Sequence, residues 1–229
     1  MTRRFKDVFS IIGPSMVGPS SSHTAGAVRL GRTARQLLGG QPERAEIIFY
    51  GSFAETYRGH GTDVAVVAGL LDYDTDDERI ARSFEEAESA GLSFTLRTSK
   101  QAAAHPNTAT FILSRGDSRA RVKGCSIGGG NIEIIGVDDF DVKFTANYPT
   151  YLIFHDDEPG FIARMTAILS KAGTNIGYME VDRKSRSGAA LTVIESDEVI
   201  GEAALLEIER LSSVSSIRHI NLASRTGGA

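Results

Sequence analysis

The sequence crowds hydroxyl groups, an imidazole and flexible glycines into a short segment directly ahead of a helical pattern. Residues 13–24 read GPSMVGPSSSHT, and the apolar spacing of a helix begins at Thr24. Free N–H groups and the positive end of a helix dipole attract a carboxylate or phosphate, and hydroxyls add further donors. His23 can then act on the molecule bound there. The alternative interpretation is a well-capped helix behind a serine-rich loop.

A second histidine lies between two glycines, ahead of another apolar helical segment. Residues 50–63 read YGSFAETYRGHGTD, in which Gly59 and Gly61 leave His60 sterically open. An imidazole with an ordinary pKa of about 6.5 can serve as acid or base at cellular pH. Asp63 follows three residues later, and it either orients this imidazole or caps the helix.

Two further segments combine turn-forming residues with polar groups. Residues 105–108 read HPNT, in which proline stiffens the turn and Asn107 offers an amide donor and acceptor. Residues 126–131 read SIGGGN, a turn whose bare backbone can wrap a small polar group. The sequence has no G-x-x-x-x-G-K-[ST] phosphate-binding motif and no H-E-x-x-H zinc-protease motif. The hydroxyl-rich segments therefore favour a small polar anion, such as an amino acid, as the ligand.

The composition excludes several classes of protein. The 229 residues include 25 Lys and Arg against 29 Asp and Glu, so the net charge of −4 offers no cationic surface for nucleic acid. The one cysteine, Cys125, forms no internal disulfide and builds no cysteine-rich zinc or iron–sulfur site. Any such cluster must come from elsewhere. No apolar run approaches the roughly 20 residues of a membrane span. The basic start lacks the apolar stretch of a secretory signal, so we expect a cytoplasmic protein.

The N-terminal half mixes helical and strand patterns and predicts one α/β domain. Gly39 and Gly91 end two of its predicted helices, and Thr75 or Asp76 is the expected cap of the third. The predicted helices cover residues 24–38, 63–71 and 76–90, and the predicted strands cover 45–52, 92–99, 107–115, 119–128 and 131–137.

The C-terminal part reads as strand, helix, strand, strand, helix, strand, which is the βαββαβ order of a ferredoxin-like fold. The first helix has one apolar stripe and is followed by Gly173, and the polar residues 185–188 predict a hairpin between the two middle strands. We therefore expect two domains, one at residues 1–147 and one at residues 148–229.

This C-terminal part resembles an ACT domain, the small ferredoxin-like module that binds amino acids. The resemblance rests on residues 157–160 (DEPG), on Asn175-Ile176 and on Met179. It implies effector binding by Gly160, where a ligand can approach the backbone at a helix start, and by the amide of Asn175. The alternative is that Gly160 only makes the turn and that Asn175 caps or turns the chain.

The four polar segments, in the order GPSSSHTAGAVRLGR, YGSFAETYRGHGTD, HPNT and CSIGGGNIEI, resemble the β-subunit family of the iron–sulfur-dependent L-serine dehydratases. The N-terminal half then resembles the allosteric substrate-binding domain also found in some phosphoglycerate dehydrogenases. The resemblance implies conversion of L-serine to pyruvate and ammonia. It also implies that His23 and His60 transfer protons or position the substrate, and it leaves open which of them is the base. The residues that it implies in substrate binding are Ser21, Ser22, Thr24, Thr62, Asn107 and Ser126.

The same resemblance implies a cofactor and a partner that this chain does not supply. In the family, a [4Fe–4S] cluster is ligated by cysteines of a separate α subunit or α domain, and one iron acts as Lewis acid toward serine. The lone Cys125 agrees with that division. We therefore expect a heteromer with an α subunit, no dehydratase activity of this chain alone, and possible homodimerisation through the ACT domain.

Two other functions are weighed against this one. A free-standing regulatory sensor would bind an amino acid in its ACT-like domain and act on an unrelated enzyme. A fragment of a phosphoglycerate dehydrogenase is disfavoured because the sequence has no G-x-G-x-x-G dinucleotide-binding turn.

Overall fold

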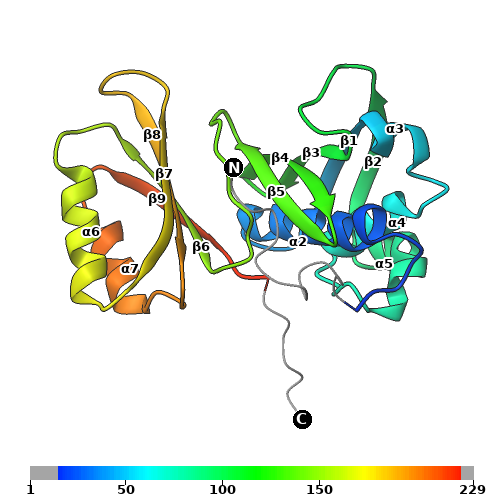
Figure 1. Ribbon diagram of the computed structural model, residues 1–229, viewed down its shortest axis with the longest axis horizontal. Helices are drawn as coiled ribbons and strands as arrows, with labels where there is room; N and C mark the ends of the chain where they lie inside the picture. Colours follow the sequence, from blue (N-terminus) through cyan, green and yellow to red (C-terminus); the bar gives the residue numbers. More distant parts are fainter. Residues whose placement is uncertain (1–14, 223–229) are drawn as a thin grey trace, which may run out of the picture. The chain divides into compact units, whose positions relative to one another are not determined.

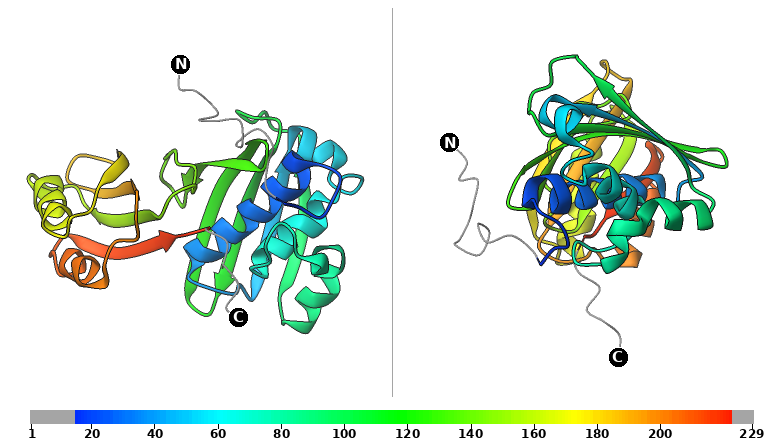
Figure 2. Two further views of the ribbon diagram at one scale, coloured as in Figure 1. Left: turned by 60° about the horizontal axis from the view of Figure 1, so that its bottom comes forward. Right: turned by 90° about the vertical axis from the view of Figure 1, so that its right-hand side faces the viewer.

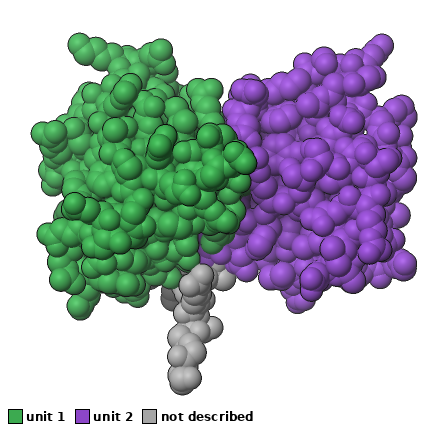
Figure 3. Space-filling model, turned by 180° about the vertical axis from the view of Figure 1, so that it is seen from behind, with its two compact units in different colours: residues 1–135 green, residues 136–229 purple. Residues whose placement is uncertain are grey.

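A computed structural model describes residues 15–222 of the chain (Figure 1). Gly13 and Pro14 of the first motif lie outside these residues. The chain divides into two compact units, residues 1–135 and 136–229 (Figure 3). No helix among the described residues has both the length and the apolar character that crossing a bilayer requires.

The first unit is an α/β layer built on a five-stranded sheet in the order β2-β1-β3-β4-β5. β2 is parallel to β1, whereas β1 with β3 and β3 with β4 are antiparallel. The helices gather on one face of this sheet (Figure 2). Its helical elements are the π-helical turn η1 (Ser21–Ala25), α2 (Gly26–Leu38), α3 (Gly51–Thr56), α4 (Thr62–Leu70), the 3₁₀ turn η2 (Glu78–Arg82) and α5 (Ser83–Ser89). Its strands are β1 (Arg44–Tyr50), β2 (Ser93–Ser99), β3 (Thr108–Arg115), β4 (Ser118–Gly128) and β5 (Asn131–Val137).

Two glycines allow α2 and α4 to pack with their backbones in direct contact. A Cβ atom at Gly69 would lie 2.1 Å from the carbonyl oxygen of Val28, and one at Gly31 would lie 2.4 Å from that of Val66. Any larger residue would force the helices apart, because protein interiors leave no free volume for it. This contact fixes the separation of the two helices that begin at the polar motifs.

The third predicted helix, residues 76–90, is wrong as one element, because a 3₁₀ turn and a short α-helix replace it. The cap is Asp77 rather than Thr75 or Asp76: its side chain accepts a hydrogen bond from the backbone N–H of Arg79 at 2.9 Å. The Arg79 guanidinium also donates to this carboxylate, which holds the tight turn in place. The helix resumes at Ser83, whose buried hydroxyl donates to the carbonyl of Val64 at 2.7 Å.

The second unit has the predicted ferredoxin-like fold. Its sheet runs β7-β8-β6-β9, so the first and last strands of the unit, β6 and β9, are neighbours, and every neighbouring pair is antiparallel. α6 and α7 cover one face of the sheet (Figure 1), and Ile153, Phe161, Met165 and Ile208 form the core between them. The elements are β6 (Thr150–Asp156), α6 (Phe161–Lys171), β7 (Ile176–Arg183), β8 (Ala189–Ser196), α7 (Glu202–Glu209) and β9 (Val214–Ile220).

The segment ahead of β6 is bonded to the second unit. The carboxylate of Glu195 on β8 accepts hydrogen bonds from the backbone N–H groups of Thr145 and Ala146, each at 3.1 Å. Glu180 on β7 accepts one from the backbone N–H of Lys143 at 2.7 Å. The compact units therefore divide before this segment, and the domain boundary expected at residues 147–148 stays a prediction.

Candidate active site in the N-terminal unit

The first motif forms a capped turn that leads directly into α2. Ser20 has an extended backbone, and its Oγ accepts a hydrogen bond from the backbone N–H of His23 at 3.1 Å. The same Oγ lies 3.4 Å from Nδ1 of the His23 ring. One hydroxyl therefore holds both the turn and the imidazole, so the segment is a capped helix start that also orients a histidine.

The structure brings the two predicted catalytic histidines side by side. The ring centroids of His23 and His60 lie 4.9 Å apart, with the rings inclined by 62°. The hydroxyl of Thr24 donates to the backbone carbonyl of His60 at 3.5 Å, which ties the start of α2 to the turn that precedes α4. His60 is exposed and His23 is half-buried. The pair therefore presents one open and one partly sheltered imidazole to a ligand.

Burial and the neighbouring imidazole lower the pKa of His23. Loss of water around the ring is the larger cause, and repulsion from a charge on His60 is the second. The lowered pKa favours the neutral ring at neutral pH. A neutral imidazole can accept a proton, so the environment suits a base or a hydrogen-bond acceptor.

Asp63 belongs to the start of α4 rather than to His60. Its carboxylate accepts a hydrogen bond from the backbone N–H of Val64 at 2.9 Å, and burial raises its pKa. Within residues 15–222 no hydrogen bond joins Asp63 to an imidazole. Asp63 is not the cap of α4 either, because the N-cap is Gly61 and Asp63 lies within the first turn of the helix.

The third and fourth motifs reach the same end of the sheet. In the antiparallel register Tyr50 pairs with Thr108, and Thr108 pairs with Cys125, so the end of β1, the start of β3 and the end of β4 coincide. Asn107 accepts a hydrogen bond on its backbone oxygen from the N–H of Ser126 at 2.9 Å, and its amide lies 3.5 Å from the Ser126 carbonyl oxygen. All four polar segments of the sequence analysis therefore meet.

Close contacts at two glycines hold these segments together. A Cβ atom at Gly26, the first residue of α2, would lie 2.1 Å from Oγ of Ser126. A Cβ atom at Gly51, the first residue of α3, would lie 2.6 Å from the carbonyl oxygen of Pro106. Glycine is required at both places because the neighbouring chain fills the space of a side chain.

The predicted substrate-binding hydroxyls differ in what they contact. Ser21 and Ser22 are half-buried, and their hydroxyls form no hydrogen bond within residues 15–222. Thr62 and Ser126 are completely buried, and their hydroxyls also lack a hydrogen-bond partner in that range. Four of the six predicted substrate-binding residues thus keep unused hydrogen-bonding capacity, whereas Thr24 and Asn107 already contact the chain.

Two serines of the site were not predicted. Ser52 Oγ lies 3.4 Å from Nε2 of His23, on the opposite side of the ring from Ser20. The ring of Phe53 packs edge-on against the same imidazole, with 5.2 Å between centroids. Ser20 and Ser52 both lie at a helix start within the motifs. This position is the feature of the sequence that could have identified them as site residues.

The described residues do not fit a metal or iron–sulfur centre of their own. Within residues 15–222 no three His, Cys, Asp or Glu side chains are grouped so that they could hold a metal ion. Cys125, the single cysteine, is buried at 2% exposure. Within these residues the candidate site therefore offers imidazole and hydroxyl groups, and no group of three metal-ligating side chains.

The two effector-binding residues predicted in the second unit are not brought together. Gly160, with a φ of 84°, directly precedes α6, and Asn175 follows the other end of this helix. An 11-residue α-helix is about 16 Å long. The Asn175 amide donates to the carboxylate of Asp197 at 2.5 Å and lines a pocket of about 260 Å³ that does not include Gly160. Effector binding by these residues stays a prediction.

The fold and site define an α/β domain with paired histidines, followed by a ferredoxin-like domain. The family model of the serine dehydratase beta chain matches residues 5–134. The probable L-serine dehydratase beta chain of Bacillus subtilis (strain 168) is 46% identical over 217 residues, which cover 95% of this chain and 99% of that one. The chain therefore belongs to the serine dehydratase beta chain family.

Two further comparisons describe similar proteins. The L-serine dehydratase beta chain of Peptoniphilus asaccharolyticus is 34% identical over 210 residues, covering 90% of this chain and 95% of that one. Among solved structures, the ACT domain from GTP pyrophosphokinase of Chlorobium tepidum matches with a TM-score of 0.27 and 18% identity, over 32% of this chain and 97% of that one. The ferredoxin-like assignment itself rests on the strand order β7-β8-β6-β9.

Proposed function

We propose that this chain is the β subunit of an L-serine dehydratase that converts L-serine to pyruvate and ammonia together with an α subunit. The observation that carries the proposal is the pair of imidazoles, 4.9 Å apart, at a helix start lined with hydroxyls. An amino acid offers a carboxylate for the helix start and an α-proton for a neutral imidazole. Membership of the serine dehydratase beta chain family supports the choice of serine.

In this proposal His23 and His60 transfer protons or position the substrate. The lowered pKa of His23 keeps its ring neutral near pH 7, and Ser20 and Ser52 fix the orientation of that ring. The ring of His60 is exposed and therefore open to a ligand, so the two imidazoles have complementary environments.

The substrate carboxylate and hydroxyl would be held by the unpaired hydroxyls of the site. Ser21 and Ser22 precede α2, where the helix dipole favours an anion. Thr62 and Ser126 are buried without a partner in the described chain, and an unpaired buried hydroxyl is costly. A bound polar molecule that reached these groups would supply the missing hydrogen bonds.

The proposed cofactor is a [4Fe–4S] cluster ligated by the α subunit and not by this chain. The single cysteine and the lack of a metal-binding group within residues 15–222 support this division. Such a cluster would supply a Lewis acid for the serine hydroxyl. The groups that move or hold protons on this chain remain the imidazoles and hydroxyls described above.

Co-expression with a cysteine-rich α subunit tests the proposal. The purified complex, assayed without oxygen, is expected to form pyruvate and ammonia from L-serine, whereas this chain alone is expected to leave serine unchanged. Deamination by the lone chain would contradict the proposed division of labour. An inactive complex, combined with saturable serine binding to the isolated chain, would instead identify a regulatory sensor.

A further inference from the structure

A loop outside the four motifs is bonded to the segment that leads into the site. The side chain of Thr75 donates a hydrogen bond to the backbone oxygen of Ser15 at 2.7 Å. The backbone oxygen of Thr75 in turn accepts one from the N–H of Val17 at 2.8 Å. Thr75 is 5% exposed, so both bonds are sheltered from water. A single residue thus holds the first motif at two points near its start.

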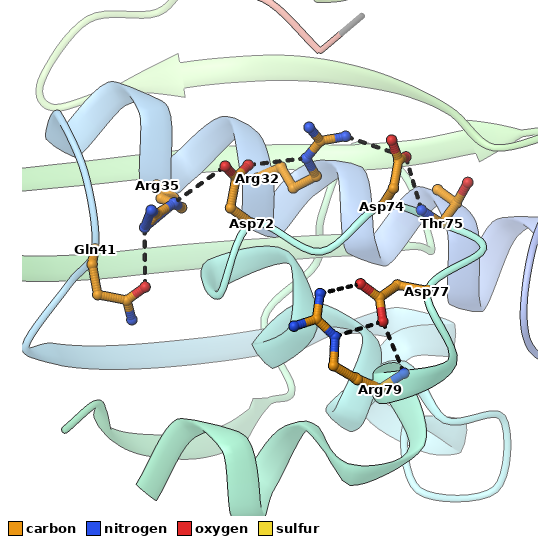
Figure 4. A network of polar contacts seen from close by, with 8 residues as sticks. All are labelled: Arg32, Arg35, Gln41, Asp72, Asp74, Thr75, Asp77 and Arg79. Atoms are coloured by element: carbon orange, nitrogen blue, oxygen red, sulfur yellow. Dashed lines mark hydrogen bonds and ion pairs between the residues drawn. The ribbon is translucent and has the colours of Figure 1, made fainter. Parts of the chain in front are cut away.

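Thr75 is itself held by an ion-pair network that includes a residue of α2. The carboxylate of Asp74 accepts a hydrogen bond from the backbone N–H of Thr75 at 2.9 Å and forms an ion pair with Arg32 at 3.2 Å (Figure 4). Arg32 also pairs with Asp72 at 3.2 Å, and it is 4% exposed. Arg32 belongs to α2, the helix that begins at the candidate site. Thr75 is therefore linked to α2 through Asp74 and Arg32.

The anchored segment contacts the site through one glycine. Gly18 has a φ of 126°, and a Cβ atom there would lie 2.7 Å from the side chain of Thr24. The hydroxyl of Thr24 reaches the backbone of His60, and Ser20 follows two residues after Gly18. A shift at Val17 would therefore displace Ser20, which orients the His23 ring, and the serines proposed to bind the carboxylate. It would also disturb the hydrogen bond from Thr24 to the backbone of His60.

We infer that Thr75 is a positioning residue: its hydroxyl anchors residues 15–18 and thereby sets the place of the substrate-binding serines. The inference rests on the proposed function for its effect on serine turnover. Its effect on the loop is independent of that function.

The test compares three variants in the complex with the α subunit. Thr75→Val removes only the hydroxyl, Thr75→Ser keeps it, and Thr33→Val is the matched control. Thr33 lies in α2, is completely buried, and its hydroxyl has no hydrogen-bond partner within residues 15–222. Thr75→Val is expected to raise KM for serine about tenfold, while Thr75→Ser and Thr33→Val keep the wild-type KM. A smaller fraction of folded protein would lower kcat without changing KM.

Hydrogen exchange on the isolated chain separates the inference from the proposed function. In Thr75→Val the amides of residues 16–24 are expected to exchange about tenfold faster, with those of α5 and of the second unit unchanged. Wild-type protection of residues 16–24 with wild-type KM would overturn the inference, as would an equal loss of protection throughout the first unit. If the wild-type complex does not deaminate serine, the proposed function fails, and hydrogen exchange still decides whether Thr75 anchors the loop.

Discussion

The polar motifs of the first unit are brought together by the fold, whereas those of the second unit are kept apart. In the first unit, segments far apart in sequence meet at one end of the sheet and place His23 beside His60. In the second unit, Gly160 and Asn175 are near in sequence but lie at opposite ends of α6. Antiparallel strands return the chain to the same end of the sheet. A helix instead separates the residues at its two ends by about 1.5 Å per residue. Sequence order alone therefore does not show which polar residues form one site.

The two units also differ in how they use histidine. His23 is half-buried beside another imidazole, with a hydroxyl near each ring nitrogen. His155 in the second unit is 5% exposed, stacks on Phe161 with 3.7 Å between centroids, and has both nitrogens hydrogen-bonded to Asp156 and Thr192. The environment of His23 allows its ring to exchange a proton with a ligand. The environment of His155 is that of a side chain in the core.

Removing either imidazole of the first unit should have the largest effect. His23→Ala and His60→Ala are each expected to lower kcat of the complex by about 10²- to 10⁴-fold, the usual contribution of a proton-transfer group. The measurement is anaerobic serine deamination, with the cluster content checked by its absorbance. His219→Ala, at an exposed histidine of the second unit, is the control and should keep full activity. Full turnover by both site variants with an intact cluster would contradict the catalytic assignment.

Crowding the helix contact of the first unit should have the next largest effect. Gly69→Ala places a Cβ atom 2.1 Å from the carbonyl oxygen of Val28 and is expected to lower the free energy of unfolding by about 1–3 kcal/mol. Gly177→Ala in the second unit meets no atom closer than 3.6 Å and should change it by less than about 0.5 kcal/mol. Urea denaturation measures both values. Equal effects would show that the close α2–α4 contact is not a constraint.

The helices and strands were largely predictable, because their apolar spacing is local. All six elements of the second unit follow the predicted order, and α4 begins within one residue of its predicted start. The cap at Asp77 was missed because it depends on where the Arg79 side chain folds back. The contact between Ser52 and His23 was missed because it depends on how α3 and η1 meet in space, and no spacing rule encodes that.

The buried histidine of the second unit should make stability depend on pH. Burial lowers the pKa of His155, although Asp156, Asp157 and Glu158 nearby act in the opposite direction. As pH falls below the ordinary pKa of histidine, the unfolded chain binds a proton before the folded chain does. The free energy of unfolding therefore falls, by at most about 1.4 kcal/mol per pH unit for one such group. His155→Phe should flatten this slope, measured as Tm between pH 7 and pH 5. An unchanged slope in the variant would show that other groups cause it.

The smallest predicted effect concerns the coupling between the two imidazoles of the first unit. His60→Asn removes the charge that contributes to lowering the pKa of His23, so that pKa should rise. It should still remain below its ordinary value, because burial is the larger cause and is unchanged. Titration of the ring signals by NMR in the isolated chain measures the shift without any need for activity. His155 is the internal control, and its titration should be the same in both proteins. A fall in the pKa of His23, or no change, would mean that the rings do not interact electrostatically despite their 4.9 Å separation.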